Sequence, residues 1–293
     1  MNTSGIEIED AMDISPLAAQ SDQPTDRAPA VAVRGLTLRA GKRTIFEDVT
    51  FDVGTGSLAV LAGASGTGKS ALALALAGRL TPTAGQVSVL GLALPRQAGA
   101  ARRKVGFTGN ATVTPLDETL TVRHHVAEAL ELAGPWWRRS ATHEQVGRTI
   151  TAANDLLGAL GDAFGDDPAA APLAQARLHR GELVRDASPV ARFALGLVLA
   201  LVSAPDILVV DDVDRLRTSD ERRAAWAALL TLERTRRDGV PPLTVVATCQ
   251  DRQELDDVLH AGHRLSALPL RPVAVHDLGS AASLPSSPAP EIR

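Results

Sequence analysis

Apolar and polar residues alternate along the first part of the chain. Between Val31 and Val53, apolar residues recur at roughly every second position, on either side of a turn at Gly41. This period is typical of strands that bury one face, so the segment is predicted to form a small antiparallel sheet. Further strands are predicted at Gln86–Leu90 and Val105–Thr108.

Other strands are predicted from continuous apolar runs. Leu58–Ala62, Ile207–Val210 and Leu243–Thr248 lack the polar alternation, and the last two are rich in β-branched residues. Such runs are typical of strands buried on both faces of a parallel sheet. Two short strands are also predicted near residues 264–268 and 271–275.

Segments in which apolar residues recur at helical spacing lie between these strands. The predicted helices are Ala71–Ala77, Leu120–Leu132, Thr142–Leu160, a helix with Ser188 as its N-cap and Pro189 as its first residue, and Ser219–Arg237. Residues 161–172 are rich in Gly, Asp, Ala and Pro and predict a loop. The alternation of strands and helices predicts an α/β fold with a parallel core sheet.

One domain is expected, at residues 30–276, with a helical insertion at about 111–187. The flanking residues 1–29 are rich in Asp, Ser, Pro and Gln, and residues 277–293 are dominated by Ser, Pro and Ala. Both flanks contain few large apolar side chains, so they cannot bury enough surface to offset the entropy of ordering. We expect them to be disordered tails.

Composition and charge exclude several classes of protein. The chain carries 30 basic and 34 acidic residues, so it has no excess of positive charge for a nucleic-acid partner. A single cysteine, Cys249, excludes an internal disulfide. The N-terminus lacks a signal pattern, and the longest uncharged apolar stretch, Phe193–Ala204, is too short to span a bilayer. We therefore expect a cytoplasmic protein.

A glycine-rich motif lies between the predicted strand Leu58–Ala62 and the helix after it. Its sequence, Gly63-Ala-Ser-Gly-Thr-Gly-Lys69-Ser70, matches the P-loop (Walker A) pattern G-x-x-x-x-G-K-S. Glycines allow backbone N–H groups to converge on phosphate oxygens at the start of a helix. The candidate nucleotide-binding residues are Gly63, Ala64, Ser65, Gly66, Thr67, Gly68, Lys69, Ser70 and Ala71. The alternative is a turn that only joins a strand to a helix.

A phosphate loop requires a second group for the metal ion that accompanies the phosphates. The Ser70 hydroxyl is a candidate ligand for Mg²⁺, and Lys69 is expected to reach the β and γ phosphates. Asp211 ends the buried strand Ile207–Val210, at the sheet edge where ligands bind in open α/β folds. We therefore expect Asp211 to hold Mg²⁺ through water, although it could also cap a following helix.

These motifs, in this order, resemble the nucleotide-binding subunit of ATP-binding cassette (ABC) transporters. The resemblance covers residues 31 to about 275 and includes Leu120-Thr-Val122. It implies a P-loop NTPase core with a parallel sheet, a small N-terminal antiparallel subdomain and an inserted helical subdomain. It also implies ATP and Mg²⁺ as cofactors.

Several positions depart from the pattern of the family. Ala40 stands where the family has an aromatic residue that stacks on adenine, and Asn110 where it has a glutamine after a Val-Gly-Phe strand. Cys249 takes the place of the switch histidine. In the signature segment only Ser188 is kept, and Pro189 with Val190 replaces the small residues that approach a partner's γ-phosphate.

Asp212 occupies the position of the family's catalytic glutamate. An aspartate is shorter by one carbon–carbon bond, about 1.5 Å, and a misplacement of about 1 Å can cost on the order of a hundredfold in rate. The resemblance therefore implies Asp212 and Lys69 as catalytic residues of a weak ATPase. Asn110 and Ser188 join the expected nucleotide-binding residues.

The function expected from this resemblance is that of the ATP-binding subunit of an ABC transporter-like system. It would pair as a homo- or heterodimer and couple ATP binding or slow hydrolysis to a separately encoded membrane protein, on the inner face of the membrane. The alternative is a nucleotide-binding regulatory or scaffold protein with little or no ATPase activity.

Two other groups of charged residues are expected to have no special role. His124 and His125 have no acid or cysteine partner at metal-binding spacing, and a solvated pair is favoured. Arg222 and Arg223 alternate with acidic residues, which is typical of a solvated, ion-paired helix face.

Overall fold

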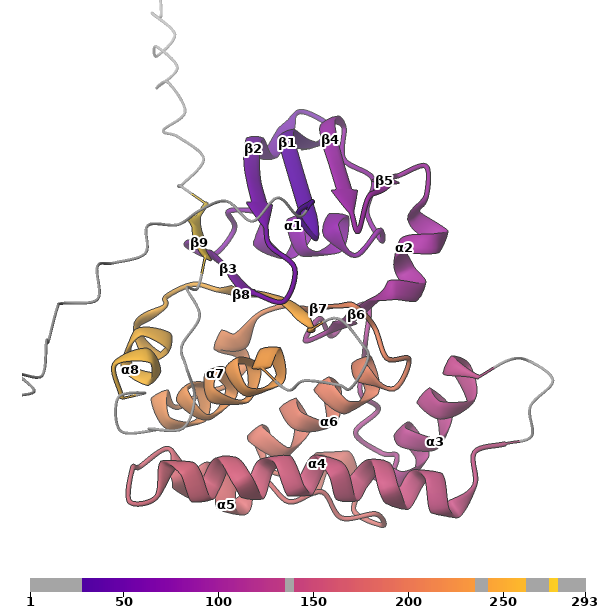
Figure 1. The fold of residues 1–293 in the computed structure, drawn as a ribbon, viewed down its shortest axis with the longest axis vertical. Helices are drawn as coiled ribbons and strands as arrows, with labels where there is room; N and C mark the ends of the chain where they lie inside the picture. The colour runs from indigo at the N-terminus through magenta and orange to yellow at the C-terminus, as the bar shows by residue number, and fades with distance from the viewer. Residues whose placement is uncertain (1–27, 135–139, 235–241, 262–273, 279–293) are drawn as a thin grey trace, which may run out of the picture.

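The computed structural model describes residues 28–134, 140–234, 242–261 and 274–278. Two sheets form its frame (Figure 1). The antiparallel sheet has the order β2-β1-β4-β5 and consists of β1 (Val31–Ala40), β2 (Arg43–Val53), β4 (Ala84–Val89) and β5 (Leu92–Leu94). The parallel sheet has the order β6-β7-β8-β3-β9 and consists of β3 (Leu58–Ala62), β6 (Val105–Thr108), β7 (Ile207–Val210), β8 (Thr244–Cys249) and β9 (Ala274–Asp277).

Helices separate and cover these sheets. They are α1 (Lys69–Leu76), α2 (Ala98–Lys104), α3 (Val122–Ala133), α4 (His143–Phe164), α5 (Ala170–Gln175), α6 (Pro189–Leu201), α7 (Ser219–Arg234) and α8 (Gln253–Ala261). In Figure 1, α1 lies between the two sheets, whereas α6 and α7 lie on the other side of the parallel sheet and α4 with α5 lies beyond them. The parallel sheet is therefore a central layer with apolar groups on both faces.

The side chains of each central strand divide between two cores. Leu58, Val60 and Ala62 of β3 belong to the core on the side of α6 and α7, whereas Ala59 and Leu61 belong to the core shared with α1 and the antiparallel sheet. This division follows from the strand period of two. It explains why the strand sequences are apolar without interruption.

The predicted fold class is confirmed: an antiparallel sheet, a parallel core sheet and helices between β6 and α6. The strand β5 and the helices α2 and α8 were not predicted. Ser188 caps α6 as expected, because its hydroxyl accepts a hydrogen bond from the Ala191 N–H at 3.2 Å.

The loop predicted at residues 161–172 is shorter in the structure, at residues 165–169. Helix α4 continues to Phe164, and α5 begins at Ala170. Leu157, Leu160 and Phe164 are buried in the helix-side core, so tertiary packing outweighs the low helix propensity of Gly161. Pro172 lies in the first turn of α5, where a missing N–H is tolerated.

The predictions for His125, Arg222 and Arg223 also need correction. His125 is 6% exposed, and its Nε2 lies 3.1 Å from the Asp117 carbonyl oxygen, so it is not solvated. Arg222 contacts Glu254 of α8, and Arg223 makes two hydrogen bonds of 2.6 Å to Asp167 in the turn before α5. These arginines connect elements that are distant in sequence.

Several predictions fall outside the described residues. These are the tails at residues 1–27 and 279–293, the strand near residues 264–268 and the end of the helix beyond Arg234. The boundaries of the domain and of its helical insertion stay predictions. In the described parts of the chain, no helix combines the length and apolarity needed to cross a bilayer.

Candidate functional site

The glycine-rich motif connects β3 to α1 by a turn that only glycines permit. Gly66 and Gly68 have φ values of 85° and 89°, in the left-handed region. A Cβ on Gly68 would also lie 3.0 Å from the Ile45 carbonyl oxygen, so a larger residue would be strained and crowded. The first N–H groups of α1 have no partner within the helix and remain available to an anion at this end.

Lys69 lies inside this loop. Its ammonium donates to the carbonyl oxygens of Gly63 at 2.6 Å and Ala64 at 2.9 Å, and the residue is 9% exposed. An ammonium has three donors, so one remains for a ligand while two hold the loop together. Thr67 also supports the loop, because its hydroxyl donates to the Ala64 carbonyl oxygen at 2.9 Å.

An open pocket of about 320 Å³ lies over the loop. Its lining residues are Ile45, Ser65, Gly66, Gly68, Lys69, Ser70, Ala71, Asp212, Thr248 and Gln250. Its volume is within the range of small-molecule sites. The structure therefore brings most of the predicted loop residues together with Asp212. Ile45, Thr248 and Gln250 are additions that the sequence pattern did not indicate.

Asp211 lies behind this pocket, at the end of β7. It is 2% exposed. One carboxylate oxygen accepts a hydrogen bond from the Thr248 hydroxyl at 2.8 Å, and the other accepts one from the Asn110 side-chain amide at 2.9 Å. These bonds give each carboxylate oxygen a hydrogen-bond partner in the interior. The carboxylate is therefore held by Thr248 of β8 and by Asn110, which follows β6, and does not cap a helix.

The donor set suits Mg²⁺ held mainly by a nucleotide. Each Asp211 oxygen keeps further lone-pair sites after accepting one hydrogen bond, and Ser70 lies in the pocket lining. Within the described ranges, no group of three or more His, Cys, Asp or Glu side chains could hold a metal by itself. Mg²⁺ commonly binds through one or two protein groups, substrate phosphates and water, which fits Ser70 with Asp211.

Asn110 forms a turn and also contacts Asp211, whereas its predicted role in nucleotide binding stays a prediction. Its side-chain oxygen accepts from the backbone N–H groups of Thr112 and Val113, as in an asparagine turn, while its amide donates to Asp211. The preceding Gly109 makes this possible: a Cβ there would lie 2.0 Å from the Asp211 carbonyl oxygen. Asn110 is therefore behind Asp211 and not among the pocket-lining residues.

Asp212 reaches the pocket because its backbone is left-handed, with φ of 64°. Its N–H donates to the Thr248 hydroxyl at 2.7 Å. Burial raises the pKa of Asp212, and the nearby carboxylates of Asp214 and Asp211 raise it further. A raised pKa makes the carboxylate a better proton acceptor than an ordinary aspartate.

Besides Asp211 and Asn110, three further positions singled out in the sequence lie outside the pocket lining. Ser188 is committed to capping α6, and Ala40 is exposed and lines no part of the pocket. Cys249 is 1% exposed and belongs to the helix-side core, and burial raises the pKa of its thiol to about 12. The assignment of the switch position to Cys249 is therefore wrong: its neighbours Thr248, in β8, and Gln250, which follows β8, line the pocket.

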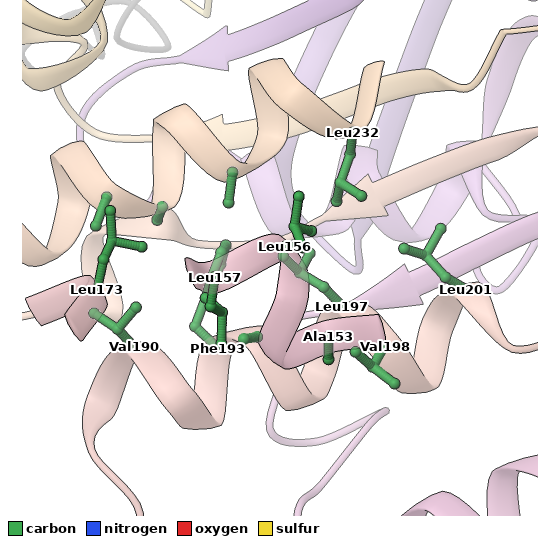
Figure 2. A pocket seen from close by; sticks show the side chains of 14 residues that line it. Ala153, Leu156, Leu157, Leu173, Val190, Phe193, Leu197, Val198, Leu201 and Leu232 are labelled. Atoms are coloured by element: carbon green, nitrogen blue, oxygen red, sulfur yellow. The ribbon is translucent and has the colours of Figure 1, made fainter. Parts of the chain in front are cut away.

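A second hollow lies among α4, α5, α6 and α7 and is lined only by apolar side chains (Figure 2). It has a volume of about 30 Å³. A cavity of this size could hold a water molecule, but a water needs polar partners. It is a packing defect of the helix-side core and offers nothing to a charged ligand.

Comparisons with known proteins address the family of this chain. A family model for ABC transporters matches residues 46–214. Among curated relatives, the Nod factor export ATP-binding protein I of Rhizobium meliloti is 27% identical over 242 residues, which covers 81% of this chain and 63% of that protein. The taurine import ATP-binding protein TauB of Burkholderia pseudomallei is 34% identical over 174 residues, covering 59% of this chain and 56% of that protein. The chain thus matches less than two thirds of the length of these relatives.

Solved structures share the fold at low sequence identity. The cbiO1 protein of Clostridium perfringens, part of the ABC transporter complex cbiONQ, has a TM-score of 0.59 at 12% identity, over 79% of this chain and 82% of that one. A dimeric ATP-binding cassette bound to ADP and Pi has a TM-score of 0.56 at 18% identity, over 76% of this chain and 89% of that one. Since the family model also covers more than half of the 293 residues, the chain belongs to the ABC transporter family.

Proposed function

We propose that this chain binds Mg-ATP as the ATP-binding subunit of an ABC transporter system and hydrolyses it slowly. The observation that carries the proposal is the convergence of the phosphate loop with Asp211 and Asp212. The strand ends of β3, β7 and β8 lie side by side in the parallel sheet. The phosphate loop follows β3, and Asp211 and Asp212 follow β7, so these groups meet at one edge of the sheet. Mg²⁺, when bound, would neutralise charge on the phosphate oxygens.

Each group at this edge of the sheet has its own role in the proposed reaction. The loop N–H groups and Lys69 bind the phosphates and oppose their negative charge. Ser70 and Asp211 would hold the metal ion. Asp212 orients a water and accepts its proton, and its raised pKa favours this role. Because Asp212 is shorter than a glutamate, we expect the water to be held less well and turnover to be slow.

The proposal includes a dimer and a membrane partner. One of the solved cassettes is dimeric, and cbiO1 is part of a transporter complex. Ser188 lies away from the pocket of its own chain, which agrees with a role at the site of a second subunit. The membrane partner would be separately encoded, and the chain would lie at the inner face of the membrane, in the cytoplasm.

A second candidate is a nucleotide-dependent regulatory or scaffold protein. It is favoured by the replacements Asp212, Pro189 and Val190, which weaken the catalytic and signature positions but leave the phosphate loop intact. Such a protein would bind ATP with little or no release of phosphate.

Nucleotide titration of the purified protein with Mg²⁺ tests binding. Lys69→Ala is expected to weaken ATP binding at least about tenfold, because charge-assisted hydrogen bonds to phosphate are lost. Unchanged ATP affinity in this variant would contradict the proposal. Steady-state phosphate release then separates the candidates: turnover that disappears in Asp212→Ala identifies an ATPase, and ATP binding without turnover identifies the regulatory protein.

A further inference from the structure

The antiparallel sheet forms one wall of the pocket over the phosphate loop. Ile45 of β2 lines the pocket, and a Cβ on Gly68 would lie 3.0 Å from its Cγ2 atom and 3.0 Å from its carbonyl oxygen. The same Cβ would lie 3.0 Å from the Cδ1 atom of Phe46. The face of β2 that carries Phe46 therefore covers the phosphate loop.

Strand register places Arg43 on that same face. Leu38 of β1 pairs with Phe46 of β2. Ala40, two residues further along β1, pairs with Arg43. The register shift between these pairs falls on β2, which has one residue more, so the alternation along β1 is kept. Alternate residues of a strand point to one side of the sheet, and directly opposite residues share a face. The Arg43 side chain therefore lies on the face that covers the loop, at the end of β2 next to the hairpin turn.

The Arg43 side chain is free to contact a ligand. It is exposed, and its guanidinium makes no hydrogen bond or ion pair with any of the residues that the structure describes. Ala40 opposite it has only a methyl group, which leaves the sheet face beside Arg43 open. Arg39, on the other face, is instead paired with Glu47 at 2.6 Å. The two arginines of this hairpin thus differ, because only the one on the outer face has a partner.

We propose that Arg43 stacks its guanidinium on the base of the bound nucleotide. The phosphates are expected at the end of the pocket that holds Lys69, so the nucleoside extends along the remaining wall, where Ile45 is the large apolar side chain. Arg43 lies on the same strand, two residues beyond Ile45. A guanidinium is planar and stacks on aromatic rings, which a lysine ammonium cannot do. This inference rests on the proposed function, and it assigns the base a contact outside the lining of the pocket.

The test compares ATP with inorganic tripolyphosphate, which supplies the phosphates without a base. Both are titrated calorimetrically in the presence of Mg²⁺. Arg43→Ala is expected to weaken ATP binding about fivefold, the loss typical of one cation–π contact, and to change tripolyphosphate binding less than about twofold. The matched control is Lys42→Ala, which removes a neighbouring exposed charge in the hairpin turn and is expected to leave the ratio of the two affinities unchanged.

A second variant keeps a planar group but removes the charge. Arg43→Trp is expected to keep ATP affinity within about twofold of that of the unaltered protein, because an aromatic ring also stacks on a base. Equal losses for ATP and tripolyphosphate in Arg43→Ala would show that Arg43 acts on the phosphates and would overturn the inference. No loss for ATP, or the same selective loss in Lys42→Ala, would overturn it as well. Failure of the unaltered protein to bind either ligand would instead contradict the proposed function.

Discussion

Asp211 shows how one side chain acquires its role from its neighbours. It is nearly inaccessible, yet its two oxygens accept hydrogen bonds from Thr248 and Asn110. Buried carboxylates need such donors to stay ionised. Removal of either donor would leave one buried oxygen of Asp211 without a hydrogen-bond partner, so Thr248 and Asn110 both contribute to the site although only Thr248 lines the pocket.

Cys249 gives a prediction at the same scale. Burial, with the nearby Asp214 charge, raises the pKa of its thiol from 9.0 to about 12. Only the thiolate reacts with an alkylating reagent, so at pH 8 the folded protein should react on the order of a thousandfold more slowly than the unfolded chain. Because Cys249 is the single cysteine of the chain, mass spectrometry after treatment with iodoacetamide measures its alkylation rate directly.

The raised pKa of Cys249 also predicts that the free energy of unfolding falls at alkaline pH. A folded-state pKa above the unfolded value means that stability is complete below about pH 9 and falls as the pH rises toward 12. Rapid alkylation at pH 8 of protein that keeps its native circular dichroism would show that the thiol is not buried.

At the scale of elements, strand ends and charged pairs connect segments that are far apart in sequence. Gly109 lets the end of β6 approach Asp211 after β7. Arg222 joins α7 to α8 through Glu254, which is 6% exposed and also accepts from the Ser219 hydroxyl at 2.8 Å. Burial alone would raise the pKa of Glu254, but the hydrogen bonds from Arg222 and Ser219 outweigh it and lower the pKa.

Arg222→Ala is predicted to destabilise the protein by about 3 kcal/mol, because it leaves the Glu254 carboxylate buried without its cation. Urea unfolding at pH 7 measures this change. The control is Arg148→Ala, which breaks an exposed pair with Glu144 and should cost less than about 0.5 kcal/mol.

The difference in unfolding free energy between the unaltered protein and Arg222→Ala should change with pH in one direction. Since the folded-state pKa of Glu254 is lowered, the pair stabilises the protein above the ordinary value of 4.5, and this contribution is lost as the pH falls through the folded-state pKa. The gap between the unaltered protein and Arg222→Ala should therefore narrow in acid. A gap that is absent at pH 7 would mean that the pair does not connect α7 to α8 in solution.

At the scale of the whole molecule, the parallel sheet separates two cores that serve different purposes. The core shared with α1 and the antiparallel sheet supports the phosphate loop. The helix-side core joins α4, α5, α6 and α7 to the sheet, and it contains the small apolar cavity (Figure 2). Both cores contact the same strands, so loss of packing in the helical layer should affect the sheet that carries the site.

Leu157→Ala tests the helix-side core. Leu157 is 4% exposed and lines the cavity, so its truncation should enlarge the cavity and cost about 3 kcal/mol of unfolding free energy. Urea unfolding followed by circular dichroism measures this cost. The matched control is Leu132→Ala on α3, where the leucine is 80% exposed and its truncation should change stability by less than about 0.5 kcal/mol. Equal effects of the two variants would contradict the assigned packing.

The sequence by itself determined the elements whose signals are local. Strand periodicity, the uninterrupted runs of the parallel sheet, the cap at Ser188 and the loop from Gly63 to Ser70 all follow from the chemistry of adjacent residues. The same locality explains the errors. Residues 161–172 are rich in loop-forming residues, but 161–164 and 170–172 are helical because their helices pack against distant side chains.

Only the tertiary structure decided which side chains face the pocket. Counting along the chain from the family pattern selected Cys249, whereas the pleat of β8 directs that thiol into the helix-side core and leaves Thr248 and Gln250 beside the loop. Asn110 likewise reaches Asp211 because β6 and β7 are neighbours in the sheet. The physical reason is that a side chain's direction and its contacts depend on strand register and packing, which residue spacing alone does not specify.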